Sequence, residues 1–295
     1  MERVRNRRRM APDVPGVQVP QESGVREPPA TLSDPPHYDG PVMRSRFTRP
    51  RLLAAGLVAL VLVPAIAAAA ILGVGRSLPP VTGVQLDQPV PPVQLLDASG
   101  RPASLASFHG RYVVLAPFLT LCHEVCPITT GAYLEMQQAV AMAGLADRVA
   151  FVEVTVDPGR DVPARLRAYA QLTGSDWALL TGSAGQIATF WKSFGVGYEV
   201  QPIGSPAPID WWTQRPETYD VAHSDGLFFL DPSGHERIAV VGTPDVGGKL
   251  NSTLTSLLDQ QGLQNLHDPQ AAWTVPQALD DLGHLLGQRI PVPSS

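Results

Sequence analysis

The stretch RYVVLAPFLTLCHEVCPITTGAYLEMQQAVAMAG, residues 111–144, decides the fold of this chain. After Arg111 it begins with a continuous run of mostly β-branched and aromatic residues, which is typical of a buried strand. From Pro127 onward apolar residues recur at helical spacing up to Gly144, where the helix is expected to end. The stretch therefore predicts a strand, a short turn and a helix, and the turn contains both cysteines of the chain.

Strand-like and helix-like patterns alternate through the rest of the chain. Besides a small hairpin at 93–105, the expected elements are strands at 149–156, 177–180, 227–230 and 238–241, and helices at 161–172, 184–194, 246–258 and 275–286. Asp161 is expected to cap its helix. Residues 195–217 contain four prolines and predict an irregular loop. This order predicts an α/β, thioredoxin-like fold with an inserted loop before the C-terminal β-hairpin.

One segment near the start, Leu52–Gly75, contains no charged residue. A membrane-spanning helix needs about 20 apolar residues, so this segment predicts a transmembrane anchor. The basic flank upstream is expected to stay in the cytoplasm, which places the rest of the chain on the extracytoplasmic side of the cell or inner membrane. The alternative is a cleaved signal peptide that starts at Met43, and both interpretations export the domain.

The charge is distributed unevenly along the chain. Residues 1–51 hold ten Arg against six Asp or Glu, whereas residues 77–295 hold eleven Lys or Arg against twenty-one acids. An acidic body without a basic stripe argues against nucleic acid as a partner. The proline-rich start has almost no periodic apolar pattern, which predicts disorder.

The two cysteines, Cys122 and Cys126, lie between the predicted strand and helix. In a helical turn, four-residue spacing places both sulfurs on one face, with the Cα atoms about 6 Å apart. That separation allows a disulfide and also allows both thiolates to bind one soft metal ion. Thiols at a helix N-terminus are more acidic, and the thiolate is the form that binds metal and attacks disulfides.

A third ligand is needed because two thiolates leave most metals under-coordinated. His223 lies just before the predicted hairpin, and the thioredoxin topology brings it towards the N-terminus of the cysteine helix. His123 lies between the cysteines but off their shared face. Since a lone histidine is more often structural or merely exposed, these residues alone leave the role of His223 open.

Four ordered segments resemble the Sco/SenC family of copper-handling proteins of respiratory membranes. They are FLTLCHEVCP at 118–127, VTVDPGRDVPARLRAYA at 154–170, WALLTG at 177–182 and YDVAHSDGLFFLDPSG at 219–234. In that family two cysteines and the histidine before the hairpin bind copper. The resemblance therefore implies that Cys122, Cys126 and His223 are copper ligands here. One departure is His123, which stands where the family commonly has proline.

Two thiolates and one imidazole favour Cu(I), with Cu(II) as a second form to consider. The resemblance implies a copper chaperone that acts in assembly of the binuclear copper centre of cytochrome c oxidase. Its expected partner is the copper-bearing subunit of that oxidase, or another copper or thiol protein. The alternative is an exported thiol–disulfide oxidoreductase that uses Cys122 and Cys126 as a redox pair to reduce such partners.

The expected organisation of the chain has five parts. They are a disordered basic cytoplasmic tail (1–51), a transmembrane anchor (52–75), a linker (76–92), a thioredoxin-like copper-binding domain (93–260) and a C-terminal extension (261–295). The role of the extension does not follow from the sequence.

Overall fold

The computed structural model describes residues 78–267 and 271–292. The predicted tail at 1–51 and the predicted anchor at 52–75 lie outside the described residues. Among the described residues, no helix combines the length and apolar character that crossing a bilayer requires.

The described residues form an eight-stranded mixed sheet with the strand order β1-β10-β9-β4-β5-β6-β2-β3. Its strands are β1 (Val84–Pro89), β2 (Leu95–Asp97), β3 (Pro102–Ala103), β4 (Tyr112–Phe118), β5 (Val149–Thr155), β6 (Ala178–Thr181), β9 (Gly226–Leu230) and β10 (His235–Val241). Strands β4, β5 and β6 pair in parallel, whereas β9 runs antiparallel to β4 and β10 antiparallel to β9. The predicted α/β class and the predicted β9–β10 hairpin are confirmed.

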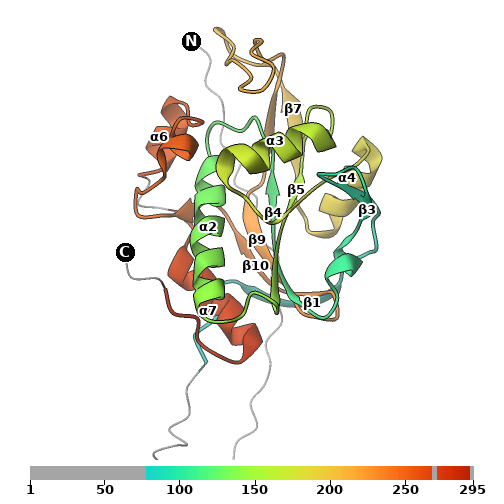
Figure 1. Cartoon of the computed structure of the whole chain (residues 1–295), viewed down its shortest axis with the longest axis vertical. Coiled ribbons are helices and arrows are strands. Elements are labelled where there is room, and N and C mark those ends of the chain that lie inside the picture. The colour runs from blue at the N-terminus through green and yellow to red at the C-terminus, as the bar shows by residue number, and fades with distance from the viewer. Residues whose placement is uncertain (1–77, 268–270, 293–295) are drawn as a thin grey trace, which may run out of the picture. The chain divides into compact units, whose positions relative to one another are not determined.

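Helices cover both faces of the sheet (Figure 1). Helices α2 (Cys126–Met142) and α7 (Val275–Leu286) pack on one face, and α3 (Pro163–Thr173) and α4 (Ala184–Ser193) pack on the other. The described residues also form α5 (Ser252–Thr255), α6 (Gln260–Asn265) and a short 3-10 helix at Leu105–Phe108. In β4, Val114 packs in the cluster that contains α2 and α7, and Leu115 packs in the cluster that contains α4. Successive side chains of a strand point to opposite faces, so burial on both faces explains the continuous apolar run of β4.

The predicted C-terminal helix at 275–286 is confirmed, and it belongs to the core. Leu279 and Leu282 of α7 are fully buried in the same cluster as residues of α2. At the other end of the domain, part of the segment expected as a linker forms β1, which pairs with β10 at the edge of the sheet.

The predicted helix at 246–258 is wrong. Gly247 and Gly248 adopt positive φ values of 63° and 68°, a left-handed conformation that interrupts a helix. The chain becomes helical only after Asn251, whose side chain accepts a hydrogen bond from the Leu254 N–H at 2.9 Å. The apolar spacing of the segment resembled a helix, but its two glycines determine the backbone.

Asp161 does not cap helix α3, which begins at Pro163. Its carboxylate is buried and accepts hydrogen bonds of 2.5 Å from the Thr120 hydroxyl and from the Thr155 hydroxyl. Burial raises the pKa of Asp161 to about 6 although these hydrogen bonds lower it. Asp161 thus joins the end of β5 to the turn that carries the cysteines.

The inserted segment at 195–217 is more ordered than predicted. It contains β7 (Tyr198–Gln201), which pairs antiparallel with β8 (Asp220–His223) to form a two-stranded ribbon. A buried ion pair also anchors the segment to α3, because the Arg165 guanidinium donates to both carboxylate oxygens of Asp210 at 3.0 and 2.6 Å. This ribbon is the element that carries His223.

Loss of the Arg165–Asp210 ion pair should destabilise the protein strongly. Asp210→Ala leaves the Arg165 charge buried without its partner, and we expect a loss of about 3–5 kcal/mol in the free energy of unfolding by denaturant titration. The control is Asp87→Ala, which removes an exposed carboxylate beside Arg237 and should change the unfolding midpoint little. Equal effects of the two substitutions would contradict the anchoring role of Asp210.

Candidate metal site

The three predicted ligands come from three different elements, and the structure brings them together. Cys122 lies in the turn after β4, Cys126 is the first residue of α2, and His223 is the last residue of β8. The two sulfur atoms and a ring nitrogen of His223 all lie within 4.8 Å of one another. The distance from Cys126 Sγ to His223 Nε2 is 3.6 Å. Within the described residues, this is the one group of histidine, cysteine and acidic side chains close enough to hold a metal ion.

The N-terminus of α2 directs its free backbone N–H groups at Cys122. The N–H groups of Val125 and Cys126 donate to Cys122 Sγ at 3.5 and 3.3 Å. The first N–H groups of a helix have no partner within the helix, and their partial positive charge stabilises an anion. Pro127, in the first turn of the helix, costs little there because its missing N–H would have no intrahelical partner.

The two thiols differ in acidity. A hydrogen bond from Cys126 holds the pKa of Cys122 well below the usual thiol range, against the effect of burial, and His223 lowers it further. Burial and the adjacent Cys122 sulfur raise the pKa of Cys126 well above that range. These opposite shifts favour the thiolate form at Cys122 over Cys126.

The His223 ring is oriented with Nε2 towards the sulfurs. Its Nδ1–H donates to the Ser224 carbonyl oxygen at 3.1 Å, because a carbonyl can only accept. This contact leaves Nε2 as the nitrogen available to a metal, in the way that outer-shell partners usually orient histidine ligands. Burial lowers the pKa of His223, but the Cys122 sulfur and the charge of Asp225 raise it to about 9.

Asp225 was not anticipated from the sequence. Both of its carboxylate oxygens are shielded from solvent, and neither has a hydrogen-bond partner among the described residues. Burial raises its pKa to about 7, and its charge acts on His223. Asp225 lines the same groove as Cys122 and His223, so it adds negative charge close to the three donors.

A polar groove of about 500 Å³ is lined by two of the donors, Cys122 and His223, whereas Cys126 is buried beneath them. Its rim is acidic and includes Glu124, Asp220 and Asp259, and its wall is built by the inserted segment, from Gln201 to Pro208. The groove gives an ion, or a protein that exchanges one, access to the half-buried Cys122.

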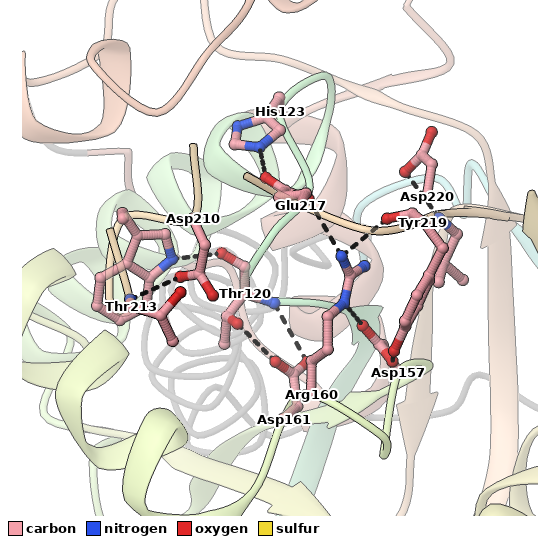
Figure 2. A network of polar contacts seen from close by, with 12 residues as sticks. Thr120, His123, Asp157, Arg160, Asp161, Asp210, Thr213, Glu217, Tyr219 and Asp220 are labelled. Atoms are coloured by element: carbon pink, nitrogen blue, oxygen red, sulfur yellow. Dashed lines mark hydrogen bonds and ion pairs between the residues drawn. The ribbon is translucent and has the colours of Figure 1, made fainter. Parts of the chain in front are cut away.

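His123 lies beside the donors but faces away from them, as its position in the turn predicts. Figure 2 shows its ring directed at Glu217, with His123 Nε2 at 2.6 Å from Glu217 Oε1. Its Nδ1 lies 2.9 Å from the Leu257 carbonyl oxygen. Burial lowers the pKa of His123, but the hydrogen bonds to Glu217 and Leu257 raise it to about 9. No local pattern in the sequence indicated Glu217, which lies 94 positions from His123.

Solved structures of similar fold include two copper-bound proteins. Bradyrhizobium japonicum ScoI with copper bound has a TM-score of 0.44 and 22% identity, covering 60% of this chain and 97% of that one. Arabidopsis thaliana ScoI with copper bound has a TM-score of 0.45 and 20% identity, covering 57% of this chain and 93% of that one.

Curated relatives match at the level of sequence. A Stutzerimonas stutzeri protein named as copper-binding is 27% identical over 177 residues, which are 59% of this chain and 79% of that protein. The mitochondrial SCO2 homolog of Bos taurus is 33% identical over 141 residues, covering 48% of this chain and 49% of that protein. The chain thus spans about half the length of the mitochondrial relative. The family model described as SCO1/SenC matches residues 85–244, more than half of the chain, and the chain belongs to that family.

Proposed function

We propose that the protein is a copper chaperone that binds one copper ion through Cys122 Sγ, Cys126 Sγ and His223 Nε2. The observation that carries the proposal is the meeting of these three donors within 4.8 Å, with Cys122 and His223 lining a groove. Two of the donors are prepared by neighbouring groups: helix N–H groups stabilise a thiolate at Cys122, and the Ser224 carbonyl orients the His223 ring.

Copper is the metal that this donor set favours. Two thiolates and one imidazole suit Cu(I), a soft ion that accepts low coordination numbers. Zinc takes the same donors but generally requires four ligands in a structural site. A site of three ligands, two of which line a groove, suits an ion that is later released. The name of the Stutzerimonas stutzeri relative as copper-binding supports this choice.

Family membership supports a role in assembling the binuclear copper centre of cytochrome c oxidase. The recipient in this proposal is the copper-bearing subunit of the oxidase, or another copper or thiol protein. Delivery would take place on the extracytoplasmic side of the membrane, with residues 52–75 as the anchor, because that segment is uncharged and follows a basic flank.

Copper titration of the reduced full chain tests the proposal. Under anaerobic conditions we expect one tightly bound Cu(I) per chain, measured by competition with a chromogenic chelator. His223→Ala should weaken binding by more than the roughly 10- to 100-fold that loss of an outer-shell partner costs. The matched control is His235→Ala, which removes a histidine that pairs with the exposed Asp87. An affinity unchanged by His223→Ala would refute the three-ligand site.

The unequal acidity of the two thiols favours a second function, thiol–disulfide exchange. Cys122 is half-buried and its pKa is lowered, whereas Cys126 is buried and its pKa is raised, which is the division expected between an attacking and a resolving cysteine. In such a reaction the Cys122 thiolate attacks a partner disulfide, forms a mixed disulfide and expels the second partner sulfur as a thiolate. That sulfur takes the Cys126 proton, and Cys126 then attacks Cys122 Sγ. The Cys122–Cys126 disulfide forms, and the reduced partner leaves with one thiol and one thiolate. His223→Ala should change reduction of a test disulfide much less than it changes copper affinity.

Alkylation order checks this division of roles. With limiting iodoacetamide at pH 7, the reduced protein should be modified first at Cys122, and its rate should stay high below the usual thiol pKa because the thiolate persists there. Peptide mass spectrometry measures the site and rate of labelling. Labelling of Cys126 at an equal or higher rate would contradict the assignment of Cys122 as the nucleophile.

A further inference from the structure

Both ring nitrogens of His123 have hydrogen-bond partners. The Leu257 carbonyl oxygen can only accept a hydrogen bond, so the His123 Nδ1 at 2.9 Å carries a proton. Oxygen Oε1 of Glu217 lies 2.6 Å from His123 Nε2, and the Glu217 side chain is 2% exposed. Both ring nitrogens are therefore occupied by hydrogen-bond partners, and neither is free for a metal. His123 is adjacent to Cys122 and yet is not a copper ligand.

The contacts of Glu217 extend this link to the ribbon that carries His223. Glu217 Oε2 accepts from the Arg160 guanidinium at 3.1 Å, and the same guanidinium nitrogen donates to the Tyr219 carbonyl oxygen at 2.9 Å (Figure 2). Tyr219 immediately precedes β8, which ends at His223. A series of hydrogen bonds thus runs from His123 in the cysteine turn, through Glu217 and Arg160, to the residue before β8.

Arg160, at the far end of this series of hydrogen bonds, is fixed to the main sheet. Arg160 forms an ion pair with Asp157, which follows β5, and lies over the Tyr219 ring at 4.0 Å from its centroid. The Tyr219 hydroxyl donates to Asp157 at 2.8 Å. Because these groups are mostly buried, an unpaired member would be costly, and the group is held in one arrangement.

We propose that His123 is a positioning residue: its ring, hydrogen-bonded to Glu217, ties the cysteine turn to the β8 ribbon and so sets the separation between the two sulfurs and His223 Nε2. The inference rests on the proposed copper site, and it assigns to His123 a role other than metal ligation. It also assigns a role to Glu217, whose carboxylate serves both His123 and Arg160.

Three variants of the full chain test the link: His123→Ala, Glu217→Gln and the double substitution. We expect each single substitution to weaken Cu(I) binding about 10- to 100-fold, the range for outer-shell partners of metal ligands. The double variant should bind Cu(I) about as tightly as the weaker-binding of the two single variants, because both substitutions remove the same link. In Cu(II)-loaded protein, electron spin resonance should still show one imidazole nitrogen in His123→Ala, and that signal should disappear in His223→Ala.

His235→Ala is the matched control, because it breaks a histidine–carboxylate pair with Asp87 that is distant from the donors. It should bind copper as the wild type does. Circular dichroism identifies any variant that fails to fold. If His123→Ala fails to fold, the Cu(I) affinity of Glu217→Gln, which keeps the size of the side chain, tests the positioning role.

The outcomes separate the two proposals. Folded His123 and Glu217 variants with wild-type copper affinity would refute the positioning role and leave the copper site intact. Loss of the imidazole signal in His123→Ala, with the signal kept in His223→Ala, would show that His123 is the ligand and overturn the inference. Failure of the wild-type chain to bind copper would overturn both the copper site and the positioning role.

Discussion

The 3.6 Å distance between Cys126 Sγ and His223 Nε2 is the contact on which the candidate site depends. The two residues are 97 positions apart, and neither belongs to the other's element. Cys126 is fixed at the start of α2, which packs on the central sheet. His223 lies on the β7–β8 ribbon outside that sheet, so the position of the ribbon decides whether the three donors meet.

Several contacts of the inserted segment, residues 195–217, hold the β7–β8 ribbon in place. The buried Arg165–Asp210 pair fixes its middle to α3. The Trp211 indole N–H donates to the Thr120 carbonyl oxygen at 2.8 Å, two residues before Cys122. Glu217 then links its end to His123 and Arg160. The segment that looked irregular in sequence thus contacts the cysteine turn and its surroundings at more than one point.

The sequence predicts the central sheet well because its signals are local. The apolar run of β4 and the helical spacing after Pro127 follow from burial on both faces of the sheet and on one side of a helix. Elsewhere local signals were misleading or too weak. Gly247 and Gly248 interrupt an apparently helical pattern, and the four-residue β7 is too short to stand out from its proline-rich surroundings.

The candidate site also combines residues that the sequence indicates with residues that only the fold brings into place. Cysteine spacing and topology indicate Cys122, Cys126 and His223, although the residues alone left His223 undecided until a family resemblance supported it. Glu217 and Asp225 carry no local signal, because an acidic residue in a loop is usually exposed. Only the folded arrangement shows that Glu217 is buried against His123 and that the Asp225 oxygens are shielded from water.

X-ray absorption at the copper edge of the Cu(I)-loaded full chain tests the central claim most directly, because it counts the donor atoms around the metal. The arrangement of Cys122, Cys126 and His223 predicts two sulfur neighbours and one imidazole nitrogen. A shell of sulfur without nitrogen, or of nitrogen and oxygen without two sulfurs, would contradict it.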